Sequence, residues 1–179
     1  VFCDLGSNIG NHSLFAPKFL RVAKAILFEP NPRAIEILLS NLTLNGVISR
    51  CDLSHLGVGL SDRAAGGLSI AAPGKNLGAG RMVEGDGDLA VIAGDSALAG
   101  QRVDFMKSDV EGMEMQALSG LVATIEANRP VIFIEVDRQN RDAFGAWVKA
   151  NDYAVKARYR RYRVNENFLL VCNRKPAEA

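Results

Sequence analysis

Short, uniformly apolar runs alternate with longer amphipathic stretches along this chain, and this alternation is what most constrains its fold. The runs that predict strands are residues 1–5, 25–29, 55–60, 103–108, 131–136, 153–157 and 168–172. The stretches that predict helices are residues 11–23, 33–45, 113–127 and 142–151. Strands that are apolar throughout are typical of a parallel sheet that helices cover on both faces. The pattern therefore predicts an α/β protein.

The end of the chain departs from this alternation. Residues 153–157 and 168–172 are joined without a predicted helix, so the two strands should be antiparallel neighbours at one edge of the sheet. We therefore predict a doubly wound, mostly parallel sheet of seven strands, with the last strand antiparallel. Nine of the 17 glycines lie within residues 57–87, which predicts turns there, with short strands near residues 68–72 and 89–93.

The length of the chain fits one domain. Residues 1–179 are enough to bury a core without disulfides or metals, and we treat them as a single catalytic unit. The chain has no initiator Met, and its first residues already predict a core strand. We therefore expect that further residues precede it in the natural protein.

Charge and cysteine content exclude several classes of partner. A net charge of +1 lacks the basic excess that nucleic-acid binding needs, so we expect no nucleic-acid partner. The cysteines, Cys3, Cys51 and Cys172, are odd in number and show no CxxC spacing. This argues against a disulfide framework and a zinc site and favours a reducing, cytoplasmic location. No apolar run approaches the roughly 18 to 20 residues of a membrane span.

The first predicted strand runs into a turn with the sequence DLGSNIG at residues 4–10. Gly6 can adopt a positive φ there, and Gly10 allows a close approach of the backbone. A dinucleotide fingerprint would need glycine at positions 6, 8 and 11, but Asn8 and Asn11 occupy two of these places, and no GxxxxGK[ST] phosphate loop occurs. The turn therefore favours a nucleoside without a pyrophosphate, a description that fits S-adenosylmethionine.

Further polar groups follow the next two predicted strands. Glu29 ends the second strand, 19 residues after Gly10, where a carboxylate can accept hydrogen bonds from both ribose hydroxyls. Ser61 and Asp62 follow the third strand and are placed to reach an adenine edge. A solvated strand end explains each signal alone, but their order and spacing together favour a nucleoside site at the carboxyl edge of the sheet.

These segments resemble the FkbM family of methyltransferases over most of the chain, from residue 1 to about 172. The matching segments are DLGSNIG at residues 4–10, FEPNP at 28–32, GLSD at 59–62 and, most distinctively, KSDVEG at 107–112. Ser108 stands where the family usually has an apolar residue.

The resemblance implies a Rossmann-like class I methyltransferase fold and S-adenosylmethionine as the cofactor. It also implies O-methylation of a hydroxyl on a sugar or another natural product, so the expected partner is a small-molecule or glycan acceptor. The candidate cofactor-binding residues are Asp4, Gly6, Ser7, Asn8, Gly10, Glu29, Asn31, Ser61, Asp62 and Asp109.

Ionisable residues gather at the ends of two later strands. Lys107, Asp109 and Glu111 lie at the end of the strand predicted at residues 103–108, and Glu135 lies near the end of the one after it. Such convergence beside a nucleoside pocket is typical of a tuned acid–base site, and a general base assists transfer to an alcohol. We predict that these four residues are catalytic, with Asp109 as the base and Lys107 keeping the carboxylates ionised.

Other interpretations stay open at this point. Lys107 could simply neutralise a crowded strand edge, or Asp109 and Glu111 could hold a divalent cation, although no His joins them and we expect no metal. The chain could instead be an RNA or protein methyltransferase, or an idle nucleoside-binding or scaffolding domain. An NAD(P)-dependent oxidoreductase is a weaker alternative, because two fingerprint glycines are missing. Residues 158–163 interleave Arg with Tyr, which is typical either of a substrate-binding turn or of a solvated hairpin.

Overall fold

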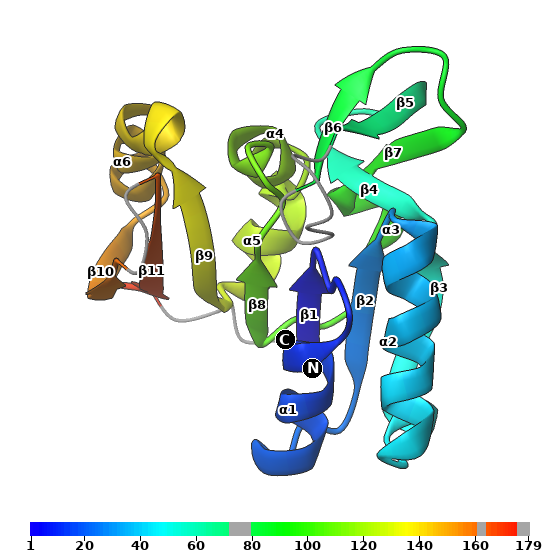
Figure 1. The fold of residues 1–179 in the computed structure, drawn as a ribbon. Coiled ribbons are helices and arrows are strands. Elements are labelled where there is room, and N and C mark those ends of the chain that lie inside the picture. The colour runs from blue at the N-terminus through cyan, green and yellow to red at the C-terminus, as the bar shows by residue number, and fades with distance from the viewer. Residues whose placement is uncertain (72–79, 161–163, 175–179) are drawn as a thin grey trace.

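A seven-stranded sheet forms the centre of the protein in the computed structural model, which describes residues 1–71, 80–160 and 164–174. Its strands are β1 (Phe2–Leu5), β2 (Ala25–Glu29), β3 (Cys51–Leu56), β8 (Phe105–Ser108), β9 (Val131–Asp137), β10 (Tyr153–Tyr159) and β11 (Asn165–Cys172). They lie in the order β10-β11-β9-β8-β1-β2-β3 (Figure 1). Strand β11 runs antiparallel to both of its neighbours, β10 and β9, and the other neighbouring pairs are parallel. The predicted α/β fold, with one reversed strand near one edge, is confirmed.

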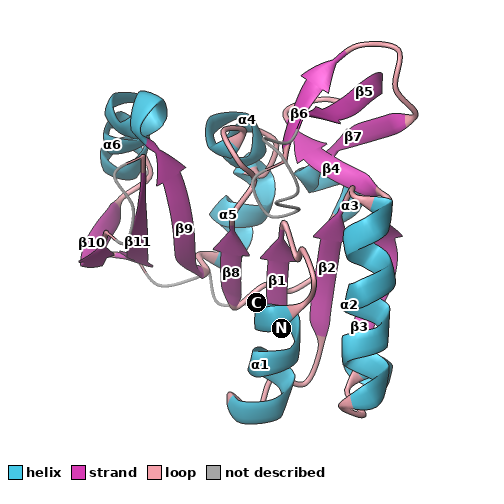
Figure 2. Ribbon diagram, viewed as in Figure 1, coloured by secondary structure: helices cyan, strands magenta, loops and turns pink. Residues whose placement is uncertain are grey.

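Helices cover both faces of this sheet (Figure 2). They are α1 (Asn11–Phe19), α2 (Pro32–Leu44), α3 (Gly94–Ala97), α4 (Glu114–Ser119), α5 (Val122–Asn128) and α6 (Arg141–Ala150), with short 3-10 turns η1 (Ile48–Arg50) and η3 (Arg138–Asn140). No helix in the described part of the chain is long and apolar enough to cross a membrane.

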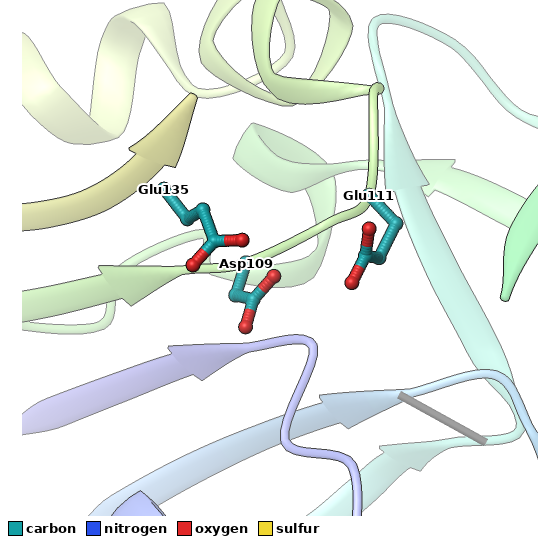
Figure 3. Close-up of side chains that lie close together, drawn as sticks. All are labelled: Asp109, Glu111 and Glu135. Atoms are coloured by element: carbon teal, nitrogen blue, oxygen red, sulfur yellow. The ribbon is translucent and has the colours of Figure 1, made fainter. Parts of the chain in front are cut away.

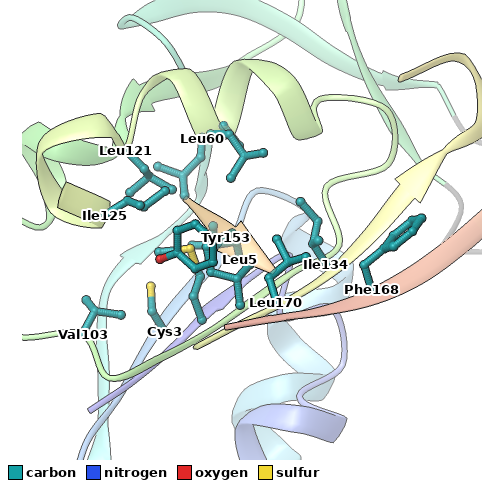
Figure 4. Close-up of a cluster of buried hydrophobic side chains, with 14 of the residues drawn as sticks. Cys3, Leu5, Leu60, Val103, Leu121, Ile125, Ile134, Tyr153, Phe168 and Leu170 are labelled. Atoms are coloured by element: carbon teal, nitrogen blue, oxygen red, sulfur yellow. The ribbon is translucent and has the colours of Figure 1, made fainter. Parts of the chain in front are cut away.

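Successive residues of a central strand pack into two different cores. Leu27 of β2 lies in a cluster with Leu38 of α2, whereas the next residue, Phe28, lies in a second cluster with Leu121 and Ile125. Figure 4 shows part of the second cluster, between the sheet and the helices near Leu121. Both side-chain directions of the strand are therefore buried, which is why its sequence is apolar without alternation.

A second sheet lies beyond the carboxyl ends of β1 and β2 (Figure 1). It contains β4 (Val58–Ser61), β5 (Ala65–Ala71), β6 (Arg81–Glu84) and β7 (Leu89–Ala93), in the order β4-β7-β5-β6. We call it the inserted sheet, because its strands fall between β3 and β8 of the main sheet. The short strands predicted near residues 68–72 and 89–93 correspond to β5 and β7, but the sequence did not indicate that they build a separate sheet.

The strand predicted at residues 55–60 is wrong, because this stretch belongs to two strands in different sheets. The main-sheet strand β3 ends at Leu56, Gly57 turns with φ +92°, and β4 begins at Val58. Glycine adopts such a φ without the steric cost that a side chain carries. A one-residue turn leaves the apolar pattern almost continuous, so the pattern alone did not reveal the break.

The helix predicted at residues 113–127 is also divided, into α4 and α5, and the break falls at Gly120 and Leu121. A Cβ on Gly120 would lie 1.9 Å from the carbonyl oxygen of Ser61, at the end of β4. The inserted sheet therefore presses against the backbone at this point. Helix α1 is shorter than predicted as well: it ends at Phe19, and Arg21 has φ +54°.

Candidate functional site

The turn after β1 is packed against the end of β8 by its backbone. Gly6 has φ +75°, and a Cβ at this position would lie 1.9 Å from the carbonyl oxygen of Asp109. The Gly6 N–H donates to the carbonyl of Phe28 at 3.0 Å, and the Asp109 N–H donates to that of Leu5 at 3.0 Å. These bonds hold the carboxyl ends of β1, β2 and β8 together, so the residues that follow these strands share one site.

Glu29, at the end of β2, is only 7% exposed and is therefore not a solvated strand tip. Its Oε2 accepts the backbone N–H of Asn8 at 2.7 Å, and its Oε1 accepts that of Asn31 at 2.8 Å. Burial raises the pKa of Glu29, while the two N–H donors act in the opposite direction. Because an ionised carboxylate has about four acceptor positions, each oxygen keeps capacity for a further hydrogen bond.

A cavity opens beside these residues and holds about 680 Å³ of space, including its mouth. Its wall comes from the ends of β1 and β2, from the inserted sheet and from the loop after β8. The residues that line it are Gly6, Asn8, Phe28, Glu29, Pro30, Asn31, Gly59, Leu60, Ile70, Gly80, Met82, Asp109, Val110, Glu111 and Met113. A largely apolar wall with a few convergent polar groups is typical of a small-molecule site.

Half of the predicted cofactor-binding residues belong to this wall: Gly6, Asn8, Glu29, Asn31 and Asp109. Three others support the turn from behind. Asp4 is fully buried and accepts the Ser13 hydroxyl at 2.5 Å, and the Ser7 hydroxyl donates to the carbonyl of Asp4 at 3.0 Å. Gly10 has φ +88°, and a Cβ there would contact Leu38 of α2 at 3.2 Å.

Ser61 and Asp62 are not part of the wall that the described residues form. The Ser61 hydroxyl donates to Asp62 at 3.1 Å, and Asp62 pairs with Arg63 at 3.5 Å. The preceding residues of the same segment, Gly59 and Leu60, line the cavity instead. A contact of Ser61 or Asp62 with adenine stays a prediction.

Lys107 is buried between the turn after β1 and the carboxylates. Its Nζ donates to the carbonyl of Gly6 at 2.6 Å and lies 3.3 Å from Asp4 Oδ1 and 3.9 Å from Asp109 Oδ2. Its closest carboxylate is therefore Asp4, which sequence reasoning placed in the cofactor site rather than beside Lys107. This ammonium connects the backbone of the turn to two acidic side chains.

Three carboxylates converge at the ends of β8 and β9, as Figure 3 shows. One oxygen of each of Asp109, Glu111 and Glu135 lies within 4.8 Å of the others. Glu111 has φ +43°, an uncommon conformation for a residue with a side chain, and this turn carries its carboxylate toward the group. The structure therefore brings together three residues that the sequence singled out, and their catalytic role stays a prediction.

Two asparagines of the reversed strand hold Glu135 in place. The side-chain amides of Asn165 and Asn167 both donate to its carboxylate, the second at 3.1 Å. Asn167 lies directly opposite Glu135 in the antiparallel pairing of β11 with β9. Sequence reasoning missed both asparagines. Their i, i+2 spacing indicates that both side chains lie on the same face of a strand. Only the pairing register shows that this face lies opposite Glu135.

Burial changes the acidity of two members of the cluster. It raises the pKa of Asp109 to about 6, and the charges of Glu135 and Asp4 act in the same direction. It raises the pKa of Glu111 to about 7, helped by the charges of Asp109 and Glu135. We expected Lys107 to keep these carboxylates ionised. Lys107 does lower the pKa of Asp109, as expected, but loss of solvation has the larger effect, so the net pKa lies above the ordinary value.

Such a cluster has two chemical uses. Carboxylates with a pKa near neutrality can accept and return a proton at physiological pH. Oxygen ligands also suit Mg²⁺ or Ca²⁺, and Asp109, Glu111 and Glu135 are the residues able to hold such an ion.

The raised pKa values predict a pH-dependent stability. Between their ordinary and raised pKa values, Asp109 and Glu111 bind protons more tightly in the folded than in the unfolded protein, so their contribution to the free energy of unfolding falls as pH rises from about 4 to 7. Asp109→Asn and Glu111→Gln should each flatten this fall. Thermal unfolding at pH 5 and pH 8 measures it, and equal pH slopes for the wild type and both variants would contradict it.

Other polar contacts near the cluster were not anticipated. Glu114 is 2% exposed and accepts the N–H of Gly112 at 2.8 Å and an N–H of the Asn140 side chain. Arg81 of β6 forms an ion pair with Asp137 at the end of β9. No motif or spacing connects Arg81 with this site, because the two partners are far apart in the sequence.

The basic turn predicted at residues 158–163 is described only in part, since residues 161–163 lie outside the described ranges. Arg158 pairs with Glu166 at 3.0 Å, and its guanidinium lies 5.6 Å from the centre of the Phe168 ring. Contact between this turn and a substrate stays a prediction.

Comparison with known proteins places the chain in a family. The family model of the methyltransferase FkbM domain matches residues 4–164. The chain belongs to the FkbM methyltransferase family. The match covers all four carboxyl-edge segments that carried the resemblance in the sequence, including the turn after β1 and the carboxylate loop after β8. No curated protein sequence matches the chain.

Solved structures share the fold of this FkbM domain at low sequence identity. The methyltransferase FkbM from Methylobacillus flagellatus has a TM-score of 0.63 at 20% identity, over 93% of this chain and 42% of that one. TrmK from M. capricolum, solved in complex with S-adenosyl-homocysteine, has a TM-score of 0.59 at 10% identity, over 99% and 63%. A putative RNA methyltransferase from Pyrococcus horikoshii has a TM-score of 0.54 at 14% identity, over 96% and 74%. The domain therefore has a Rossmann-like methyltransferase fold, and it spans less than half the length of the Methylobacillus protein.

Proposed function

We propose that this domain is an S-adenosylmethionine-dependent methyltransferase that methylates a hydroxyl group of a small molecule or glycan. The observation that carries the proposal is the cavity at the carboxyl edge of the sheet. Glu29 lies at one side of it, and the carboxylates of Asp109 and Glu111 lie at another. One wall thus suits a nucleoside, and the other offers a group able to take a proton.

The residues of the cavity fit the cofactor. The turn at Gly6 presents backbone rather than side chain, and Asn8 and Asn31 tie the same turn and the start of α2 to Glu29. The free acceptor positions of Glu29 suit the two ribose hydroxyls, and apolar residues such as Phe28, Leu60 and Met82 suit an adenine ring. When bound, the cofactor supplies a methyl group already activated as a sulfonium.

The carboxylate cluster provides the acid–base chemistry. We propose that Asp109 orients the acceptor hydroxyl and takes its proton, and that Glu111 and Glu135 hold the acceptor. Lys107 positions Asp109 and the turn after β1 through its contacts with both. With a pKa near 6, Asp109 is ionised in most molecules at neutral pH and is still basic enough to accept a proton.

The same cluster bears on the acceptor class. Structures of RNA methyltransferases share the fold, so an RNA acceptor is the second possibility. Three carboxylates within 4.8 Å of one another repel a phosphate backbone, whereas carboxylates and asparagine amides are suitable partners for hydroxyl groups. This favours a small molecule or glycan. We also propose a cytoplasmic location, which the three free cysteines support.

Cofactor choice gives a direct test. Asn8 occupies a place where the dinucleotide fingerprint needs glycine, and it is one of the residues that line the cavity. The domain should therefore bind S-adenosylmethionine or S-adenosylhomocysteine at least roughly tenfold more tightly than NAD, a difference of about 1.4 kcal/mol. Isothermal titration calorimetry with the three ligands measures this. NAD binding that is equal or tighter would overturn the proposed function.

A further inference from the structure

One wall of the cavity comes from the inserted sheet. Gly59 and Leu60 of β4, Ile70 of β5, and Gly80 and Met82 at β6 line the cavity from this side. Strand β4 is held firmly, because it follows β3 after one residue and its end packs against Gly120. Strand β6 is the edge strand of the inserted sheet, and among the strands that the structure describes it pairs only with β5.

Arg81 joins this edge strand to the opposite side of the cavity. It is the first residue of β6, next to the lining residues Gly80 and Met82. Its Nη2 pairs with Oδ2 of Asp137, the last residue of β9. Within the ranges 1–71, 80–160 and 164–174, this is the only ion pair between the two sheets.

The guanidinium also covers the loop after β8. Its Cζ lies at van der Waals distance, 3.5 Å, from where a Cβ on Gly112 would be, and its charge lowers the pKa of Glu111. Arg81 therefore lies against the loop after β8 and pairs with the end of β9. It is flanked by the lining residues Gly80 and Met82, and its charge reaches Glu111 of the carboxylate cluster.

Asp137 is positioned for this contact by its own turn. Its Oδ1 accepts the N–H of Gln139 at 3.1 Å and caps η3, which leaves Oδ2 to Arg81. The Arg81 side chain is 47% exposed and that of Asp137 is 12% exposed. A half-exposed pair of this kind contributes modestly, so it can open and close.

We propose that Arg81 and Asp137 form a latch that holds the edge of the inserted sheet over the cofactor, so that opening of this pair limits how fast the nucleoside leaves. The proposal rests on the proposed function, because it takes the cavity to be the cofactor site. Arg81 is on this view a positioning residue: it acts through β6 and the lining residues Gly80 and Met82.

A double-mutant cycle on cofactor release tests the latch. Arg81→Gln removes the positive charge of the pair. Asp137→Asn removes the negative charge and keeps a carbonyl oxygen that can accept the N–H of Gln139. Each should speed the dissociation of S-adenosylhomocysteine, measured by stopped-flow displacement, roughly 3- to 10-fold. The double variant should be no faster than the faster single variant, since the same contact is lost. Arg81→Lys should release the ligand almost as slowly as the wild type does. Only one oxygen of Asp137 pairs with Arg81, and a lysine ammonium can pair with that oxygen as well.

Arg102→Gln is the matched control, since it removes an arginine from an exposed Arg–Asp pair before β8, at the other end of the strand. It should release the ligand at the wild-type rate. Unchanged release from folded Arg81→Gln, or effects of the two single variants that multiply in the double variant, would overturn the latch. A wild-type protein that binds no S-adenosylhomocysteine would overturn the proposed function and the latch with it. A protein that binds it and shows no change in the variants would overturn the latch alone.

Discussion

Asp109→Asn should lower kcat by at least about a hundredfold while S-adenosylmethionine still binds. Asparagine keeps the size of the side chain and a carbonyl oxygen, but it cannot accept a proton, and a positioned general base is typically worth 10²- to 10⁴-fold in rate. Asp109 lines the cavity within 4.8 Å of Glu111 and Glu135, so the loss falls at the place where the acceptor hydroxyl would lie. Single-turnover kinetics with the acceptor, together with cofactor titration of the same variant, measure the two quantities separately.

The wild-type pH profile belongs to the same prediction. Asp109 works as a base only when it is ionised, and its pKa is raised to about 6, so kcat should fall as pH drops below that value. Asp109→Asn should lose this dependence.

Glu111→Gln and Glu135→Gln are the matched comparisons, since each neutralises another carboxylate of the same cluster. If Asp109→Asn turns over normally and one of these two variants does not, the base is the glutamate replaced in the inactive variant. If all three variants turn over normally, transfer relies on proximity alone. Loss of wild-type activity in EDTA, restored by Mg²⁺, would show instead that the cluster holds a cation.

Glu29→Ala should weaken cofactor binding by about 1.5 to 3 kcal/mol, roughly 10- to 150-fold. The reason is twofold. The variant loses the carboxylate that faces the cavity, and it leaves the N–H groups of Asn8 and Asn31 without the acceptor that fixes the turn. Glu29→Gln should bind the cofactor almost as weakly as Glu29→Ala, because the amide nitrogen of glutamine would face one of these N–H donors.

Calorimetric titration with S-adenosylhomocysteine measures the effect, and circular dichroism shows whether each variant is folded. Glu36→Ala, an exposed glutamate on α2, is the control for loss of one acidic residue near the same helix and should bind as the wild type does. An unchanged dissociation constant in folded Glu29→Ala would mean that the residue only supports the turn.

Much of the site was visible in the sequence because the relevant signals are local. Gly6 and Gly10 mark the turn after β1, and Glu29 closes an uninterrupted apolar run, so each is recognisable from a few neighbouring residues. Parallel strands then place the ends of β1, β2, β8 and β9 at one edge. That rule alone brings Glu29, Asp109 and Glu135 to the same edge of the sheet.

The sequence failed where the chain turns abruptly or passes from one sheet to another. The run at residues 55–60 stays apolar across Gly57, although the strands on either side of this glycine belong to different sheets. The helical pattern at residues 113–127 continues across Gly120, although β4 presses on the backbone there. Hydrophobic periodicity reports which positions are buried, not which partner buries them.

The sequence by itself therefore determined the doubly wound sheet, the turn at Gly6 and the three carboxylates, because short-range patterning encodes strands, helices and strand ends. Only the tertiary structure decided the inserted sheet, the asparagines that hold Glu135 and the pairing of Arg81 with Asp137. It also decided the pKa of Asp109, because burial raises this pKa by more than the charge of Lys107 lowers it. Each of these features depends on groups that are far apart in the chain. They come into contact only when strand register and packing bring them together.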